Sequence, residues 1–355
     1  MKLYNYLVLL ILASFMISCG EKAGEKNSDF NLNFSGGDGE FQLGESLKVN
    51  LQNKKNREID SVVYFFQDER IGKTSKNDIF EYNFRNIKLG KWELSAKIFS
   101  EGEQEEISQP VTVYNDAPPV TYTYKIINTY PHSPDAYTQG LEFHNDTLFE
   151  STGQYGESSL RKVELETGNV YESIELDDNY FAEGLTVLNN KVYQLTWKAE
   201  EGFIYDASTL EKTGNFAYSQ SKEGWGLAND GERLYKSDGT EKIWILHPET
   251  LAEENYIQTV THRTISTQLN ELEWVNGRIY ANTYQRDGVA IINPENGAIE
   301  GLINFKGLRE KLDNTEDLDP LNDVLNGIAY NPTTQKLYVT GKNWDKLFEV
   351  EIVKK

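Results

Sequence analysis

The sequence is short of the side chains that bind metals and form disulfides. Its 355 residues include one cysteine, two methionines and four histidines. A single cysteine excludes an intramolecular disulfide and any zinc site with several thiolate ligands. The histidines are His132, His144, His247 and His262, and none has a partner at ligand spacing. We therefore expect no catalytic metal and no cofactor, although the many acidic and amide oxygens leave a structural calcium open.

Basic residues are also scarce. Lysine and arginine number 35 against 56 aspartates and glutamates, which gives a formal net charge of -21. This balance argues against non-specific binding to nucleic acid or to an anionic membrane surface. The length suggests two domains. A hydrophobic fraction of 38%, with 27 glycines and 21 tyrosines, favours β-structure with many turns.

The N-terminus has the pattern of an export signal. Lys2 precedes an apolar run over residues 7–17, which is too short to span a bilayer comfortably. The run ends just before Cys19, and this arrangement resembles a bacterial lipoprotein signal. We expect a signal peptide over residues 1–18, a lipid on Cys19 and a flexible tether over residues 19–29. The protein would then be anchored in the bacterial cell envelope, facing the periplasm or the cell surface. The alternative is an ordinary signal peptide followed by a stray cysteine.

Residues 30–115 predict a small β-sandwich. Six short apolar or alternating runs are separated by turn-forming segments such as SGGDGE, NKKNRE and SEGEQE. Short strands at this spacing are typical of a sandwich, and the length suits an immunoglobulin-like module. The segment contains no residues that look catalytic. Residues 115–119 (NDAPP) read as a stiff linker to the next domain.

The rest of the chain, residues 120–355, repeats one pattern. Five segments begin QGLEFHNDTLF, EGLTVLNNKVY, WGLANDGERLY, NELEWVNGRIY and NGIAYNPTTQKLY. Periods of about 40–50 residues with some four strands each are typical of β-propeller blades. We therefore predict a five-bladed β-propeller. The last repeat lacks an outer strand, and residues 121–129 are expected to complete it and close the ring.

The repeats place polar and aromatic residues at equivalent positions of the innermost strands. The first ring consists of Gln139, Glu183, Trp225, Asn270 and Asn326. The second ring consists of Gly153, Trp197, Gly239, Tyr284 and Lys342. A purely structural ring should look alike from blade to blade, whereas these differ in every blade. The pattern predicts one asymmetric pocket at the mouth of the channel.

Each ring residue also has a structural interpretation. The aromatic residues can pack between blades, Glu183 can cap a strand, and the amides can belong to turns. Lys342 can be a solvated charge. The joint placement in two registered rings favours a site.

Several stretches resemble one enzyme family. YPHSPDAYTQGLEF, YFAEGLT, VYQLTWK, GWGLANDG, LNELEW, LNGIAY and VTGKNWDKLFEV are similar to motifs of the plant-type and bacterial glutaminyl-peptide cyclotransferases. The resemblance covers about residues 122–353 and implies a metal-independent acyltransferase acting on peptides or proteins with an N-terminal glutamine. It implies that Glu183 is the proton shuttle. Family members usually have tryptophan at the position of Tyr284 and often phenylalanine at that of Tyr137.

The resemblance also implies roles for the other ring residues. With Glu183, the catalytic group includes Asn270 and Lys342. The expected substrate-binding residues are Tyr137, Gln139, Phe181, Trp197, Trp225, Tyr284 and Asn326.

Two other functions stay open on the residues alone. One is a non-catalytic propeller lipoprotein that binds peptides or glycans. The other is a calcium-dependent lactonase, which would need several inward acidic ligands where the first ring has only Glu183.

Overall fold

The structure, a computed structural model, describes residues 28–35 and 38–355. This part of the chain is built of β-strands, which confirms the expected all-β class. The last long loop contains two short 3-10 turns, η1 (Arg309–Lys311) and η2 (Thr315–Asp317). No helix among the described residues is long and apolar enough to cross a membrane. The predicted signal peptide, Cys19 and most of the tether lie outside these residues.

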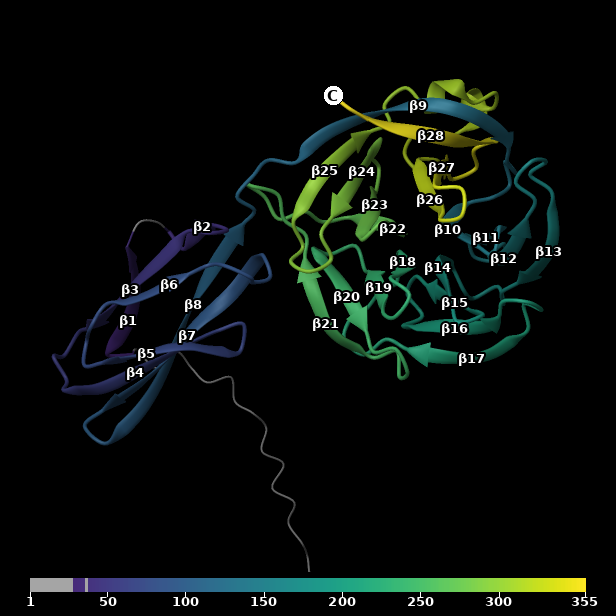
Figure 1. Ribbon diagram of the computed structural model, residues 1–355. Helices are drawn as coiled ribbons and strands as arrows, with labels where there is room; N and C mark the ends of the chain where they lie inside the picture. Colours follow the sequence, from purple (N-terminus) through teal and green to yellow (C-terminus); the bar gives the residue numbers. More distant parts are fainter. Residues whose placement is uncertain (1–27, 36–37) are drawn as a thin grey trace, which may run out of the picture.

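Two sheets form the N-terminal part of the fold (Figure 1). The first, in the order β1-β3-β6, contains β1 (Phe30–Ser35), β3 (Ser46–Asn53) and β6 (Phe80–Asn83). The second, in the order β2-β8-β7-β4-β5, contains β2 (Glu40–Gln42), β4 (Ile59–Phe66), β5 (Glu69–Ser75), β7 (Gly90–Ser100) and β8 (Glu103–Tyr114). The sequence patterns indicated six of these strands. They missed the short β2 and the polar β5, which lack a clear apolar alternation.

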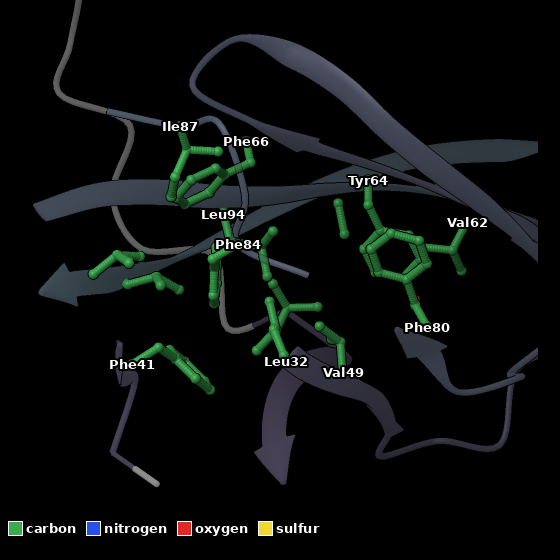
Figure 2. Packing of buried hydrophobic residues seen from close by; sticks show 14 of the residues in the cluster. Leu32, Phe41, Val49, Val62, Tyr64, Phe66, Phe80, Phe84, Ile87 and Leu94 are labelled. Atoms are coloured by element: carbon green, nitrogen blue, oxygen red, sulfur yellow. The ribbon is translucent and has the colours of Figure 1, made fainter. Parts of the chain in front are cut away.

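One apolar core lies between these two sheets. Alternate residues of β3 and β4 are buried, as the period of two in a strand requires. Tyr64 of β4 stacks on Phe80 of β6 with ring centroids 4.2 Å apart, so the two sheets meet face to face (Figure 2). Such an aromatic pair adds about 0.5–1.5 kcal/mol beyond the area it buries. The segment is therefore a sandwich, and its core continues into the ring at Val260 and Ala298.

The remaining sheets are arranged as a propeller-like ring (Figure 1). Three are four-stranded and antiparallel, each with its strands in chain order. The first contains β10 (Thr138–His144), β11 (Thr147–Thr152), β12 (Ser159–Val163) and β13 (Val170–Glu175). The second contains β14 (Ala182–Leu188), β15 (Lys191–Thr196), β16 (Glu201–Asp206) and β17 (Lys212–Ala217). The third contains β18 (Leu227–Asn229), β19 (Leu234–Ser237), β20 (Lys242–Leu246) and β21 (Glu253–Gln258).

A long strand, β9 (Val120–Pro131), joins two further sets of strands into one eight-stranded sheet. One set contains β22 (Leu269–Val275), β23 (Arg278–Thr283), β24 (Gly288–Ile292) and β25 (Ile299–Asn304). The other contains β26 (Leu325–Asn331), β27 (Lys336–Gly341) and β28 (Lys346–Lys354). The first residues of β9 pair in parallel with β25, and the rest pair antiparallel with β28. The segment before the first repeat thus completes the last set, as the sequence predicted.

The first strand of each set lies at the centre of the ring. These inner strands contact one another in the cyclic order β10, β14, β18, β22, β26 and back to β10. Every residue of β14 and β26 is buried, whereas alternate residues of the outer strand β13 are exposed. Apolar clusters fill the spaces between neighbouring sheets, for example around Leu185 and Tyr205. The inner strands are therefore rigid supports for any group that points to the centre.

The sandwich contacts the ring near the outer strand β21. Trp92 stacks on Tyr256 with centroids 5.5 Å apart. The side-chain amide of Gln258 exchanges two hydrogen bonds with the backbone of Lys91, at 2.9 and 3.0 Å. The backbone N–H of Asn115, in the predicted linker, donates to Thr261 O at 3.1 Å. The linker is thus fastened to the ring at its first residue.

Candidate active site

Four inner strands are irregular where the first ring of residues lies. The pairing register shifts between Thr138 and Gly140 in β10, and at the matching points of β14, β22 and β26. A β-bulge bends a strand and changes the direction of a side chain. The residues inside these bulges are Gln139, Glu183, Asn270 and Asn326, and all four are buried. The fold therefore places three amides and one carboxyl group at the centre of the ring.

In four of the strand sets the second-ring residue follows directly on the second strand, which is β11, β15, β23 or β27. Thr196 pairs with Ala182, and the next residue, Trp197, donates its backbone N–H to Phe181 O at 2.9 Å. Tyr284 and Lys342 occupy the same position after β23 and β27. The two rings are thus adjacent layers of one site.

Aromatic side chains form the outer wall of this site. Most are half-buried, in contrast to the buried amides, and Tyr155 is exposed. Phe181 lies edge to face with three other rings at centroid distances of 5.5–6.1 Å, namely Tyr137, Tyr155 and Trp197. Trp225 and Tyr284 form a second edge-to-face pair at 5.8 Å. The wall offers apolar faces that suit an aliphatic stem.

Two glycines of the second ring make room for this wall. A Cβ atom on Gly153 would lie 2.4 Å from the Phe181 ring, and one on Gly239 would lie 2.7 Å from the Trp225 ring. Gly239 also has a φ of +79°, which side chains rarely adopt. Both positions are small because an aromatic ring from the segment just before an inner strand, β14 or β18, occupies the space.

Glu183 is a buried carboxyl group without a hydrogen-bond partner on one oxygen. Its Oε2 accepts no hydrogen bond from the described residues, and the same holds for Oδ1 of Asn270. Burial raises the pKa of Glu183 well above its usual value, and the charge of Glu223 adds to this rise, while the Lys342 ammonium opposes it. A carboxyl group with a raised pKa can both accept and return a proton near neutral pH.

Lys342 is the buried cation of the site. Its side chain lies over the rings of Tyr137 and Tyr284, with Nζ 4.6 and 5.4 Å from their centroids. Burial lowers the pKa of Lys342 to about 8, although Glu183 and Asp323 act in the opposite direction. Two tyrosine faces and two carboxylates thus hold a positive charge beside Glu183.

The amides of the first and last sheets bind each other. Asn326 Nδ2 donates to Gln139 Oε1 at 3.0 Å and to the backbone oxygen of Thr138 at 2.9 Å. Both residues were expected to bind substrate. In the structure Asn326 orients Gln139 and joins β26 to β10, and Gln139 keeps its amide nitrogen for other partners.

The histidines lie away from this arrangement. His132 is buried between Trp344 O at 2.6 Å and Glu150 Oε1 at 2.9 Å, where it links the loop after β27 to β11. In the residues that the structure describes, no group of three or more His, Cys, Asp or Glu side chains is placed to hold a metal ion.

Sequence analysis missed Glu223. Its Oε2 accepts hydrogen bonds from the indole nitrogens of Trp197 and Trp225 at 2.8 and 2.9 Å. Glu223 lies two residues before the first-ring position of its repeat, as Tyr137 and Phe181 do in theirs. Extending the repeat alignment to that position in every blade would have identified it.

The comparisons with known proteins agree on one family. The family model for glutamine cyclotransferase matches residues 80–352. A curated glutaminyl-peptide cyclotransferase from Arabidopsis thaliana is 42% identical over 230 residues, which is 64% of this chain and 71% of that protein. The crystal structure of Myxococcus xanthus glutaminyl cyclase is similar with a TM-score of 0.62 at 34% identity, and the match covers 67% of this chain and 99% of that one.

Proposed function

The chain belongs to the glutamine cyclotransferase family, and on that premise we propose that it converts the N-terminal glutamine of peptides or proteins to pyroglutamate, with Glu183 as proton shuttle. The α-amine attacks the side-chain Cδ, the new C–N bond closes a five-membered ring, and ammonia leaves. Nucleophile and electrophile belong to one molecule, so the enzyme mainly has to fold the side chain back.

The observation that carries this proposal is a pair of buried acceptors. Glu183 Oε2 and Asn270 Oδ1 have no donors among the described residues. Leaving such a group unpaired costs roughly 1–3 kcal/mol. An N-terminal glutamine supplies N–H donors on its α-amine and on its side-chain amide, close enough together to serve both acceptors. Binding this substrate would therefore give both buried acceptors a hydrogen-bond donor.

Proton transfer runs through Glu183. Its carboxylate takes a proton from the attacking nitrogen and returns it to the leaving nitrogen, so no net proton is consumed at the residue. The raised pKa suits both steps. The Lys342 ammonium lies where it can hold a substrate carbonyl or the developing oxyanion. Gln139, held by Asn326, donates its amide nitrogen to the peptide backbone.

The aromatic wall folds the substrate. Phe181, Trp197, Trp225 and Tyr284 pack against the aliphatic stem and exclude water, and Tyr137 lies beside Lys342 at the entrance. A compact, dry pocket favours the folded conformer over the extended one. The hydroxyl groups of Tyr137 and Tyr284 add polarity to this wall.

Ammonia release from a glutamine-initiated peptide tests the function. We expect one ammonia for each peptide converted, and a product peptide that is lighter by one NH₃. The same peptide with an acetylated N-terminus should give no product. Dialysis against EDTA should leave turnover unchanged, because every step uses side chains. Peptide binding without ammonia would instead support a non-catalytic binding propeller, and loss of turnover with EDTA would point to a structural calcium.

We further propose that the ring has five blades, that the sandwich is immunoglobulin-like, and that the mature protein carries a lipid on Cys19 in the cell envelope. The cyclic contacts of the inner strands support five blades. Metabolic labelling with a fatty acid tests the anchor: label is expected on the parent and not on Cys19→Ser. Labelling of both proteins would contradict it.

A further inference from the structure

One carboxylate oxygen joins two indoles of the aromatic wall. Trp197 and Trp225 both donate to Glu223 Oε2, at 2.8 and 2.9 Å. These tryptophans come from neighbouring sheets of the ring. The backbone N–H of Gly224 donates to Trp197 O at 3.0 Å across the same boundary. Glu223 therefore fixes the spacing of two rings that no shared strand connects.

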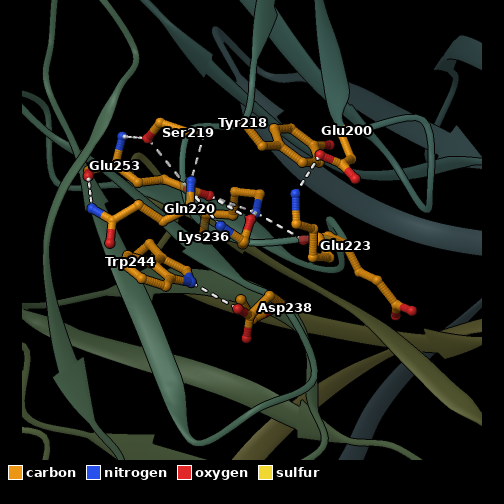
Figure 3. A network of polar contacts seen from close by, with 12 residues as sticks. Glu200, Tyr218, Ser219, Gln220, Glu223, Lys236, Asp238, Trp244 and Glu253 are labelled. Carbon is orange, nitrogen blue, oxygen red and sulfur yellow. Dashed lines mark hydrogen bonds and ion pairs between the residues drawn. The ribbon is translucent and has the colours of Figure 1, made fainter. Parts of the chain in front are cut away.

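The loop that carries Glu223 is held by a buried ion pair (Figure 3). Lys236 Nζ lies 2.9 Å from Glu253 Oε1, with side chains 0% and 1% exposed. Lys236 also donates to the backbone oxygen of Glu223 at 2.8 Å. Glu253 Oε2 accepts the backbone N–H groups of Ser219, Gln220 and Ser221. Separating the two ions would leave an unpaired charge in the interior, which is strongly unfavourable, so the loop is rigid.

Glu223 also contributes charge to the site. Its side chain is 31% exposed, and the nearest cation, Lys198, is 4.0 Å away. Its carboxylate raises the pKa of Glu183, after the larger effect of burial. The other titratable group that acts on Glu183 is Lys342, and the charge of Glu183 in turn raises the pKa values of the Tyr137 and Tyr218 hydroxyls.

We propose that Glu223 is a positioning residue for the cyclisation, which clamps Trp197 and Trp225 in one geometry and places a negative charge opposite the proton shuttle. The inference rests on the proposed function and extends it to a residue that acts on the substrate indirectly, by positioning the aromatic side chains of the wall. Without the clamp the indoles lose their common acceptor, and the pocket no longer favours the folded glutamine side chain.

Two substitutions separate the clamp from the charge. Glu223→Gln keeps a carbonyl oxygen that can accept from both indoles but removes the charge. Glu223→Ala removes both. Glu200→Gln is the matched control, because Glu200 is an exposed carboxylate in the same region, paired with Lys222 at 2.9 Å. All variants are compared in the full chain by kcat and KM for a glutamine-initiated peptide, by the pH profile of kcat/KM, and by near-ultraviolet circular dichroism of tryptophan.

For Glu223→Ala we expect KM to rise about ten-fold or more, since each hydrogen bond to a charged group is worth roughly 1.5–3 kcal/mol, together with a changed tryptophan signal. Glu223→Gln should keep KM and that signal near those of the parent, while the acidic limb of kcat/KM moves to lower pH. Glu200→Gln should match the parent. If the parent releases ammonia and Glu223→Ala behaves like Glu200→Gln, the positioning role is wrong although the proposed function stands. If the parent releases none, the proposed function itself fails, while the tryptophan signal still reports on the clamp.

Discussion

At the scale of single residues, the site depends on ionisable groups that the fold holds away from water. Glu183 and Lys342 both have pKa values moved towards their neutral forms by burial. Such positions cost stability and are typical of functional sites. Replacing either group by an uncharged side chain should therefore make the protein more stable than the parent in one pH range and impair its turnover.

Glu183→Gln should lower kcat by about 10²–10⁴-fold, since it removes the proton shuttle. The folded state holds the Glu183 proton more tightly than the unfolded chain, whose value is near 4.5. Stability contributed by this group is therefore lost as pH rises from 4.5 through the folded-state value. The variant should have a higher Tm than the parent at pH 9 and a smaller advantage near pH 4.5, by calorimetry. An equal Tm difference between variant and parent at both pH values would contradict the raised pKa of Glu183 in the folded state.

Lys342→Met tests the cation. The pKa of Lys342 is about 8 in the folded state against an ordinary value of 10.5, so stability rises with pH between these values. Below pH 8 the whole cost is present, and the variant should there be more stable than the parent, with the gain shrinking towards pH 10.5. Its acidic limb of kcat/KM should move to higher pH, because the ammonium lowers the pKa of Glu183. If the acidic limb of kcat/KM stays at the same pH in this variant, Lys342 does not influence the pKa of Glu183.

At the scale of elements, the loop that carries Glu223 is held by a buried ion pair rather than by strand pairing. Burial alone would raise the pKa of Glu253, but Lys236, the Ser221 hydroxyl and the backbone N–H of Ser221 outweigh it and lower the value to about 2. This group stabilises the fold above pH 4.5, and its contribution is lost as pH falls towards 2.

Glu253→Gln should cost about 3–5 kcal/mol in the free energy of unfolding at pH 7, because it leaves the Lys236 ammonium unpaired in the interior. The control is Glu300→Gln, which breaks the half-exposed pair with Arg278 and should cost at most about 1 kcal/mol. Urea unfolding at pH 7 and pH 3 measures both. Equal costs for the two variants would show that the ion pair does not hold the loop.

The repeat alignment was enough to predict the elements and most of the site. The repeat period predicted which positions face the centre, and Glu183, Asn270 and Lys342 are buried at or next to the inner strands in the structure. Contacts between sheets could not be predicted, because they depend on side-chain lengths across a boundary. The Asn326–Gln139 pair and the acceptor role of Glu223 are of this kind. The sandwich strand β5 was missed because its residues are mostly polar.

At the scale of the whole molecule, the contact between the sandwich and the ring combines apolar packing, such as Trp92 on Tyr256, with the polar pair of Gln258 and Lys91. Gln258 is 3% exposed and pairs with both backbone groups of Lys91, as a strand residue would. The M. xanthus relative is matched over 99% of its length by about two thirds of this chain, so that relative has little beyond the matched region. The polar pair of Gln258 and Lys91 can be removed without changing the apolar part of the contact.

Gln258→Ala should leave the N–H and C=O of Lys91 unpaired and cost roughly 1–3 kcal/mol. We expect calorimetry to show two separate unfolding transitions where the parent shows one, with kcat/KM unchanged. Gln104→Ala, at an exposed position of β8, serves as the control and should keep a single transition. A single transition in both variants would mean that the sandwich and the ring unfold together through other contacts.

The strand β9 also determines when the ring can be completed during synthesis. Its residues leave the ribosome before any inner strand, yet Tyr122 pairs with Lys354 and Pro131 with Lys346, near the opposite end of the chain. Until β28 emerges, β9 presents an unpaired edge that can bind another nascent copy. Once β28 has been made, closure of the ring within one chain has to outcompete this pairing between chains.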